Sequence, residues 1–295
     1  AAEAGHLRVC QYLVQCGADP MRPDHKLNTP LHQACRRGRV DIFEALFVVC
    51  GGGRVVNRRN SKDETALHLA AAAGKRHMVM RLVERGGDMM LQDDGGRTAL
   101  QRAATLGMSD VVEYLVVRAA EHGTEPVAGS SLAALHWAYL RDRVRLIAAA
   151  DRGPVEAGVS GAVSIHEAVW RLKQQRRILN LSSEGDGKTA LHLAADAGRE
   201  EVVDFLVGRG ADVASRDRAG NTPLHAAADE GHAGVLALVL GTGEAGVDAK
   251  NELWYTAVHL AAMHGHLECV RLLAMHSCDA TIPRKDGTTP LHSAA

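Results

Sequence analysis

The stretch that decides the fold is TALHLAADAGREEVVDFLVGRG, residues 189–210. It opens with a threonine, runs through small and apolar residues to Gly198, and then gives a second run whose apolar residues recur at three- and four-residue spacing. That spacing places apolar side chains on one face of a helix. The stretch therefore predicts two short helices, with Gly198 between them and Gly210 as the cap of the second.

The opening of this stretch returns along the chain. Related strings begin at Thr29, Thr65, Thr98, Thr189, Thr222, Thr256 and Thr289, so the steps are 36, 33, 91, 33, 34 and 33 residues. Two weaker copies, SLAALHWA and AVSIHEA, place Leu135 and Ile165 at the position of Leu100 and divide the long step into 35, 30 and 26 residues. Repetition at this period predicts one helical hairpin stacked many times.

These features resemble the ankyrin-repeat family, which has a period of about 33 residues and a T-P-L-H signature. The resemblance implies an all-α solenoid of stacked helix-turn-helix units with projecting β-turns. It divides the chain into N-terminal repeats at 1–118, two degenerate repeats with Gly/Pro-rich loops at 119–188, and C-terminal repeats at 189–295. The first and last repeats are truncated, so we expect a fragment of a longer array.

Composition narrows the class of protein. A net charge of −1 and a pI near 7.1 give no basic excess that would draw the chain onto nucleic acid. The six cysteines form no CxxC pair, so we expect free thiols and a cytoplasmic or nuclear location. No apolar run reaches the length of a membrane span, so we expect no membrane insertion. We also expect a monomer.

The chain contains 16 histidines, which raises the question of a metal site. The resemblance implies that the signature histidine bridges backbone groups of adjacent repeats, and three more histidines follow the glycine between the two helices. These two sets are His32, His68, His136, His166, His192, His225, His259 and His292, and His6, His232 and His266. Gln101 replaces the signature histidine once, which suits a hydrogen-bonding spacer better than a metal ligand. We therefore expect no metal and no cofactor.

Two strings resemble catalytic motifs and fail on spacing. HEAVW at His166 begins like a zinc-protease helix, but Trp170 stands where the second histidine belongs. GDGKT at 185–189 resembles the end of a phosphate-binding loop, but Ser182 occupies the place of its first glycine. Cys35 and Cys269 fall at apolar positions and are expected in the core. The sequence therefore predicts no catalytic residues and no enzyme.

A partner would lie on the concave side that the resemblance implies, made of turn tips and the exposed face of the first helices. Aromatic anchors dominate binding hot spots. Trp254 also stands where other turns carry a glycine, so its turn must strain or change type. Each candidate charge is equally compatible with ordinary solvated surface. The candidates are Arg36, Arg37, Asp196, Asp229, Glu230, Leu253, Trp254, Tyr255, Met263 and His264.

The predicted function is a protein-interaction scaffold or adaptor that binds a protein partner in this groove. Two alternatives remain open: the recognition or regulatory arm of a larger enzyme of the ubiquitin-ligase or kinase type, and the cytosolic ankyrin region of a membrane channel. Catalytic motifs or apolar stretches of about 20 residues outside this sequence would distinguish them. Two poor repeats in series at 119–188 also predict a weak joint, which could be a hinge or a binding insertion.

Overall fold

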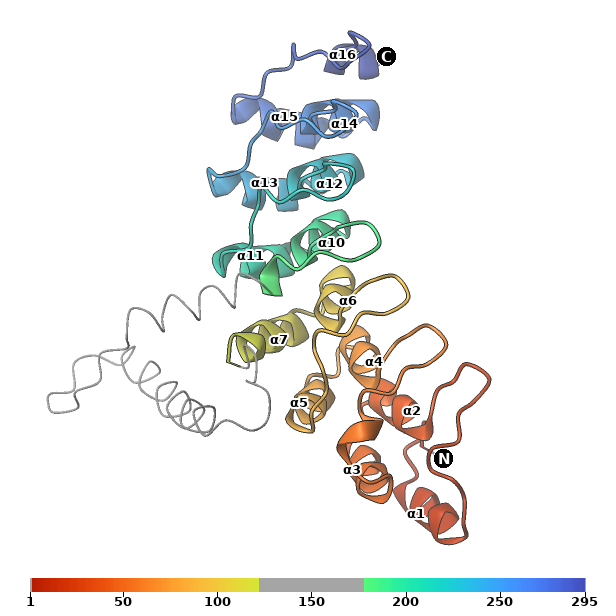
Figure 1. The fold of residues 1–295 in the computed structure, drawn as a ribbon. Coiled ribbons are helices and arrows are strands. Elements are labelled where there is room, and N and C mark those ends of the chain that lie inside the picture. The colour runs from red at the N-terminus through yellow and green to blue at the C-terminus, as the bar shows by residue number, and fades with distance from the viewer. Residues whose placement is uncertain (1, 122–177, 295) are drawn as a thin grey trace, which may run out of the picture. The chain divides into compact units, whose positions relative to one another are not determined.

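The computed structural model describes residues 2–121 and 178–294 and is helical there (Figure 1). Its only strand-like pairing in those residues is an isolated bridge between Gln92 and Thr98. This confirms the all-α prediction. The helices are α1 (Leu7–Gln15), α2 (Pro30–Arg37), α3 (Val40–Val49), the short 3-10 helix η1 (Gly53–Val55), α4 (Ala66–Ala72), α5 (Arg76–Glu84), α6 (Ala99–Leu106), α7 (Ser109–Glu121), α10 (Ala190–Asp196), α11 (Glu200–Gly208), α12 (Pro223–Glu230), α13 (Ala233–Gly241), α14 (Ala257–Met263), α15 (Leu267–Met275) and α16 (Pro290–Ser293).

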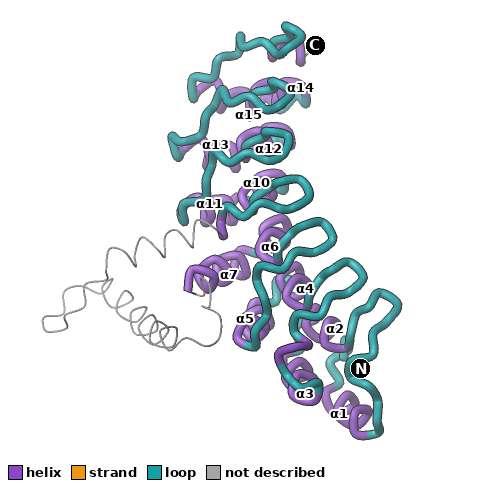
Figure 2. Tube along the Cα trace, viewed as in Figure 1, coloured by secondary structure: helices purple, strands orange, loops and turns teal. Residues whose placement is uncertain are grey.

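The helices form hairpins that stack on one another. Each first helix of a hairpin contacts the next first helix, in the order α2, α4, α6, α10, α12, α14 and α16. Second helices pack behind them, with contacts along α1, α3 and α5 and along α11, α13 and α15. Figure 2 shows the turns projecting beyond the first helices, on the side away from the second helices. This is the stacked arrangement that the resemblance implied.

The signature threonine starts each first helix. At α10, Thr189 adopts an extended conformation, its Oγ1 accepts from the His192 N–H at 3.4 Å, and its own N–H donates to His192 Nδ1 at 3.3 Å. The histidine ring thus takes the part that Glu or Gln plays in a capping box. Pro30 and Pro223 follow their threonines at the first helical position, where a missing N–H costs nothing.

The signature leucine fills the core of each layer. The five equivalent leucines expose 5% of their surface or less, and burying each contributes about 2 kcal/mol. The second helices face them with buried side chains such as Ile42, Val79 and Val203. A hairpin alone would leave these faces in water, so neighbouring layers stabilise one another. The five leucines are Leu31, Leu67, Leu100, Leu191 and Leu224.

The signature side chain joins each layer to the next. Nε2 of His68 lies 3.1 Å from the Arg97 carbonyl oxygen, and Nε2 of His192 lies 2.9 Å from that of Asn221. His32 and His225 make the same kind of bond to the following turn. The bridging role implied by the resemblance is therefore confirmed at four positions. His136 and His166 lie outside the described residues.

The layer of Thr98 lies directly against the layer of Thr189. Helix α6 contacts α10, and Gln101 donates from Nε2 to the Leu181 oxygen at 2.9 Å and to the Lys188 oxygen at 3.1 Å. Arg199 Nε also reaches the Thr105 carbonyl oxygen at 3.3 Å. Direct contact leaves no space for further layers between α6 and α10.

The interval of 91 residues between Thr98 and Thr189 does not by itself tell which copies of the repeat join this stack. The copies at Leu135 and Ile165, like Trp170, lie outside the described residues. The three-region division of the chain and the weak joint at 119–188 therefore stay predictions.

Burial of the signature histidines predicts a pH-dependent stability. Desolvation lowers the pKa of His32, His68, His192, His225 and His259 below the ordinary 6.5. The unfolded chain then binds more protons than the folded chain below that pH, so stability falls as pH drops from about 7 to about 5. Thermal unfolding at graded pH should show this. The variant His68→Gln should have a shallower pH dependence, and a flat midpoint over this range would contradict the argument.

The junction of α6 and α10 predicts a specific role for Gln101. Gln101→Ala removes both bonds to the next turn and the acceptor for the Thr98 N–H, so the free energy of unfolding should fall by about 2 kcal/mol. Gln101→His should restore most of it. Urea unfolding measures the change, and the exposed Gln11→Ala should stay within about 0.5 kcal/mol of the parent. An equally small effect at Gln101 would show that the junction is not made by this side chain.

Candidate partner-binding surface

The ends of the first helices carry the first group of candidate residues. Arg36 and Arg37 end α2, are exposed, and both contact the Glu3 carboxylate, at 3.1 and 2.7 Å. These guanidinium groups lower the pKa of Glu3, with the Arg37 hydrogen bond as the largest cause. Ion pairs this exposed contribute little to stability because solvent screens them, so both arginines remain accessible to a partner.

The acidic candidates lie on the neighbouring first helices α10 and α12, and the candidates Met263 and His264 lie at the end of α14. Asp196 at the end of α10 pairs with Lys188 Nζ at 3.0 Å. Asp229 near the end of α12 lies 3.0 Å from Nε2 of His264, which caps α14. The structure thus joins Asp229 and His264, whereas Arg36 and Arg37 are separated from Asp196 by the layers of α4 and α6. Glu230 and Met263 are exposed beside this pair.

Two further histidines, His232 and His266, each tie their own layer to the preceding one. Nε2 of His232 lies 3.1 Å from the Asp196 carbonyl oxygen, and Nε2 of His266 lies 3.0 Å from that of Asp229. These carbonyls belong to the last turn of a helix, where no intrahelical donor remains. The sequence located both histidines after a glycine but gave them no partner. Arg199, at the equivalent place before α11, also reaches backwards, so the shared sequence signal is a donor side chain directly after the glycine.

The turn tips are joined by a ladder of backbone hydrogen bonds. In each step, the N–H of a residue on one tip donates to a carbonyl on the preceding tip, at 2.9–3.2 Å. A ladder of this kind fixes the spacing of the tips without any side chain. The steps are Ser61 to Lys26, Asp94 to Lys62, Glu184 to Gly96, Arg218 to Asp186, and Glu252 to Ala219.

Trp254 lies on the tip where the ladder stops. Its φ is +64°, in the left-handed region that Gly220 occupies at +75° on the preceding tip. The turn therefore keeps its type, and the backbone of Trp254 is strained. The next step would join the Lys285 N–H to the Leu253 carbonyl, and no such bond exists in the described part of the chain. Leu253 is 67% exposed and Trp254 42%.

Cationic side chains surround this tip. Nζ of Lys250 lies 4.5 Å from the centre of the Trp254 ring, and Nζ of Lys285 lies 5.8 Å from it. Tyr255 is different, because it is half-buried and its ring is covered by the Arg284 guanidinium at 4.0 Å. Of the three candidates on this tip, Leu253 and Trp254 are therefore accessible, and Tyr255 mainly packs.

Leu27 is a residue that sequence reasoning missed. It stands at the same turn position as Trp254, has a φ of +57°, and is 50% exposed. The string HKLNTPLH places it two residues before the signature threonine, where a glycine is common in this chain. Alignment of the turns would have found it. Leu27 and Trp254 are large apolar residues at this strained position.

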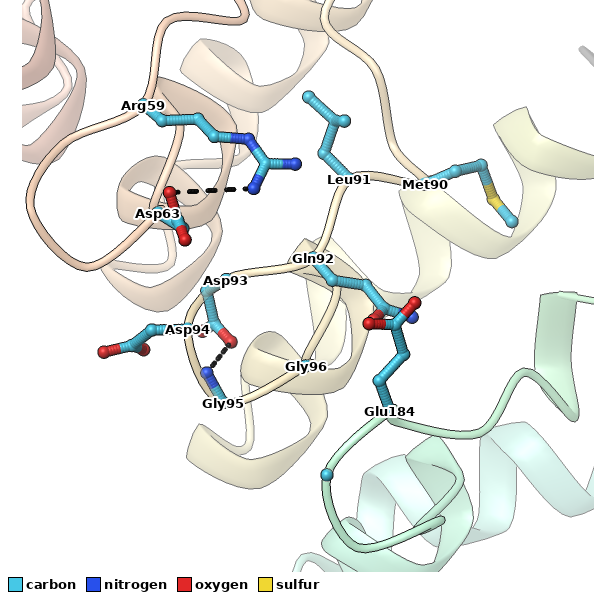
Figure 3. A pocket seen from close by; sticks show the side chains of 11 residues that line it. Arg59, Asp63, Met90, Leu91, Gln92, Asp93, Asp94, Gly95, Gly96 and Glu184 are labelled. Carbon is cyan, nitrogen blue, oxygen red and sulfur yellow. Dashed lines mark hydrogen bonds and ion pairs between the residues drawn. The ribbon is translucent and has the colours of Figure 1, made fainter.

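A groove of about 600 Å³ crosses three successive tips (Figure 3). Its lining combines Met90 and Leu91 with carboxylates at the rim, among them Asp94 and Glu184. Arg59 lies 3.7 Å from Asp63 on one side, as Figure 3 shows. The groove is open and polar, and the sequence did not single it out.

The described residues contain no cluster of metal-ligating side chains and no disulfide. Over 2–121 and 178–294, no three His, Cys, Asp or Glu residues gather in a way that would hold a metal ion. All six cysteines are free, and burial raises the pKa of Cys35. No helix in the same two ranges has the length and apolar character of a membrane span. Cys35 and Cys269 are core residues, as predicted.

The strained turn predicts that Trp254→Gly is not destabilising. Glycine removes the cost of a positive φ, so the free energy of unfolding should stay level or rise by about 1 kcal/mol. Leu253→Gly is the matched control, because φ of Leu253 is not positive and the substitution should lower stability by about 0.5–1 kcal/mol. Chemical denaturation compares the two. A clear loss of unfolding free energy in Trp254→Gly would mean that packing of the indole stabilises the fold by more than the positive φ costs.

The curated proteins that this chain resembles are longer than it. A B-cell lymphoma 3 protein homolog of Mus musculus is 29% identical over 171 residues, which cover 57% of this chain and 37% of that protein. The ankyrin repeat and KH domain-containing protein mask-1 of Caenorhabditis elegans is 30% identical over 72% of this chain and 8% of that protein. The chain thus spans well under half of these relatives.

Solved structures share the fold. The human ASB11 ankyrin repeat domain aligns over 95% of this chain and 96% of its own, with a TM-score of 0.65 and 20% identity. The ankyrin repeat domain of Bcl-3 aligns over 91% and 94%, with a TM-score of 0.62 and 24% identity. The family description "Ankyrin repeats (3 copies)" matches residues 46–129, 160–251 and 238–295, and "Ankyrin repeats (many copies)" matches residues 1–47. This chain therefore belongs to the ankyrin-repeat family, whose members generally serve as protein–protein interaction modules.

Proposed function

We propose that this chain is a protein-binding scaffold, and that its partner lies against the turn tips and the ends of the first helices. The observation that supports this most is the exposed Leu253–Trp254 pair, held on a strained turn that ladder bonds fix on its preceding side. Rigidly presented aromatic side chains lose little entropy on binding and are common in hot spots.

The helix ends support the same face. Arg36 and Arg37 form exposed ion pairs that contribute little to the fold, so their charges remain available for a complementary partner, and the Asp229 carboxylate is partly exposed beside the His264 ring. A partner that lies along several layers would meet basic groups at α2 and mainly acidic groups at α10 and α12.

The two wider roles remain as alternatives for a longer protein. One relative is a transient receptor potential cation channel homolog, of which this chain covers 14%, and another is diacylglycerol kinase zeta, of which it covers 12%. These names favour an array that serves a channel or an enzyme as its recognition arm. In each case this chain would supply binding, without cofactor or catalysis, in the cytoplasm or nucleus and as a monomer.

The binding face predicts which substitutions reduce partner recovery. In affinity purification with quantitative mass spectrometry, Trp254→Ala and the double variant Arg36→Glu/Arg37→Glu should each lower recovery of a shared set of proteins at least about threefold. Truncating a hot-spot aromatic or reversing two charges acts on the interface and leaves the core intact. Unfolding curves of both variants should match the parent.

Matched controls lie on the second-helix row. Met275→Ala removes a side chain that is 79% exposed on α15, and Arg81→Glu reverses an exposed charge on α5. Both should leave recovery unchanged. If these controls lower recovery and the face variants do not, the partner lies on the other side and the proposed face is wrong.

A further inference from the structure

Resting on the proposed function, we infer that the tip formed by Lys250, Leu253, Trp254 and Lys285 binds an acidic protein segment that carries an apolar side chain. The two ammonium groups lie 4.5 and 5.8 Å from the centre of the indole ring. An apolar side chain would lie on Leu253 and Trp254, and carboxylates beside it would pair with the two lysines. The proposal thus assigns a chemical class to the partner.

The positive charges of Lys250 and Lys285 are not paired with carboxylates of the described residues. Within the described residues, neither Lys250 nor Lys285 has a carboxylate within ion-pair distance, whereas Arg284 pairs with Asp286 at 3.5 Å. Attraction to the face of the indole holds both ammonium groups close to it, and each still has N–H donors free. An incoming carboxylate would therefore meet a preorganised pair of cations instead of two freely moving side chains.

The backbone at this tip also lacks partners. The Lys285 N–H and the Leu253 carbonyl make none of the ladder bonds that their equivalents make on other tips. The bridge from His259 to Thr288 in the same turn is also weaker than its equivalents, because Nε2 of His259 closes no hydrogen bond of ordinary geometry there. The ladder bond is thus absent at the junction beside the exposed tryptophan. An extended segment at this junction would find a donor and an acceptor unused by the fold.

A protein segment fits better than nucleic acid. Aromatic and cationic groups together also suit single strands, but binding to phosphate chains needs several cations along a path. This tip offers two unpaired lysines, Glu252 lies next to Leu253, and the whole chain has a net charge of −1. One or two carboxylates match that number of cations. Nucleic acid therefore enters as an outcome of the test.

The test measures fluorescence anisotropy of labelled probes with the full chain. The main probe is a fluorescein-labelled glutamate-rich peptide with two central leucines. Three others are the same peptide with serines for the leucines, the same peptide with lysines for the glutamates, and a labelled oligothymidine. We expect the acidic peptide with leucines to bind most tightly, with an affinity that falls as salt rises.

The variants locate the site. Lys250→Glu/Lys285→Glu should weaken binding of the main probe at least about tenfold, and Trp254→Gly should weaken it similarly while the fold remains stable. Lys62→Glu, on a tip without an aromatic residue, is the matched control and should change nothing. Equal binding by parent and double variant, or tighter binding of the lysine peptide or oligothymidine, would overturn the inference.

Failure here is distinguishable from failure of the proposed function. If the acidic peptides do not bind, yet recovery of cellular proteins still depends on Trp254 or on Arg36 and Arg37, the chemical class is wrong and the binding face stands. If the peptides bind through the two lysines, the inference holds even when the helix-end variants have no effect on recovery.

Discussion

One hydrogen bond, repeated layer after layer, underlies this structure. The fourth residue of the signature closes the cap of its own helix and reaches the carbonyl of the next turn, as His68 does at 3.1 Å and Gln101 at 2.9 Å. Histidines such as His232 reach backwards to the preceding helix end. The layers of α2, α4, α6, α10 and α12 are therefore each tied to the next layer by a buried polar side chain, and a buried group left without its partner would cost about 1–3 kcal/mol. The leucine core supplies the driving force, and these bonds fix the register.

The inner and outer positions of each hairpin therefore have different roles, one in stability and one in function. Inner positions are committed to neighbouring layers, so variation is tolerated at the tips and helix ends. Trp254 is an extreme case of such variation, because here an aromatic residue occupies a left-handed position at the junction where the ladder bond is missing. Strain of this kind persists where the surrounding structure holds it, and it is common at binding sites. Leu27 repeats the feature near the other end of the described stack.

Much of the fold followed from the sequence, because caps, leucines and glycines carry their structural roles in their chemistry. Thr189, Leu191 and Gly210 could be assigned before any coordinates. The direct contact of α6 with α10 could not, because periodicity counts copies without telling which ones stack. The packing of Tyr255 beneath Arg284 and the backward bond of His266 also depend on residues about 30 or more positions away. The sequence thus predicted which residues belong to the candidate site, but the structure was needed to show which of their side chains are exposed.

The most direct measurement of this account is the distance between the layers of Thr98 and Thr189. Spin labels at Thr105 and Asp196, on a background without the native cysteines, report it, and labels at Asp196 and Asp229 give the reference for neighbouring layers. Direct stacking predicts about 10 Å for both pairs and similar dipolar broadening. A separation of about 30 Å for the first pair, as two interposed layers would produce, would contradict the account.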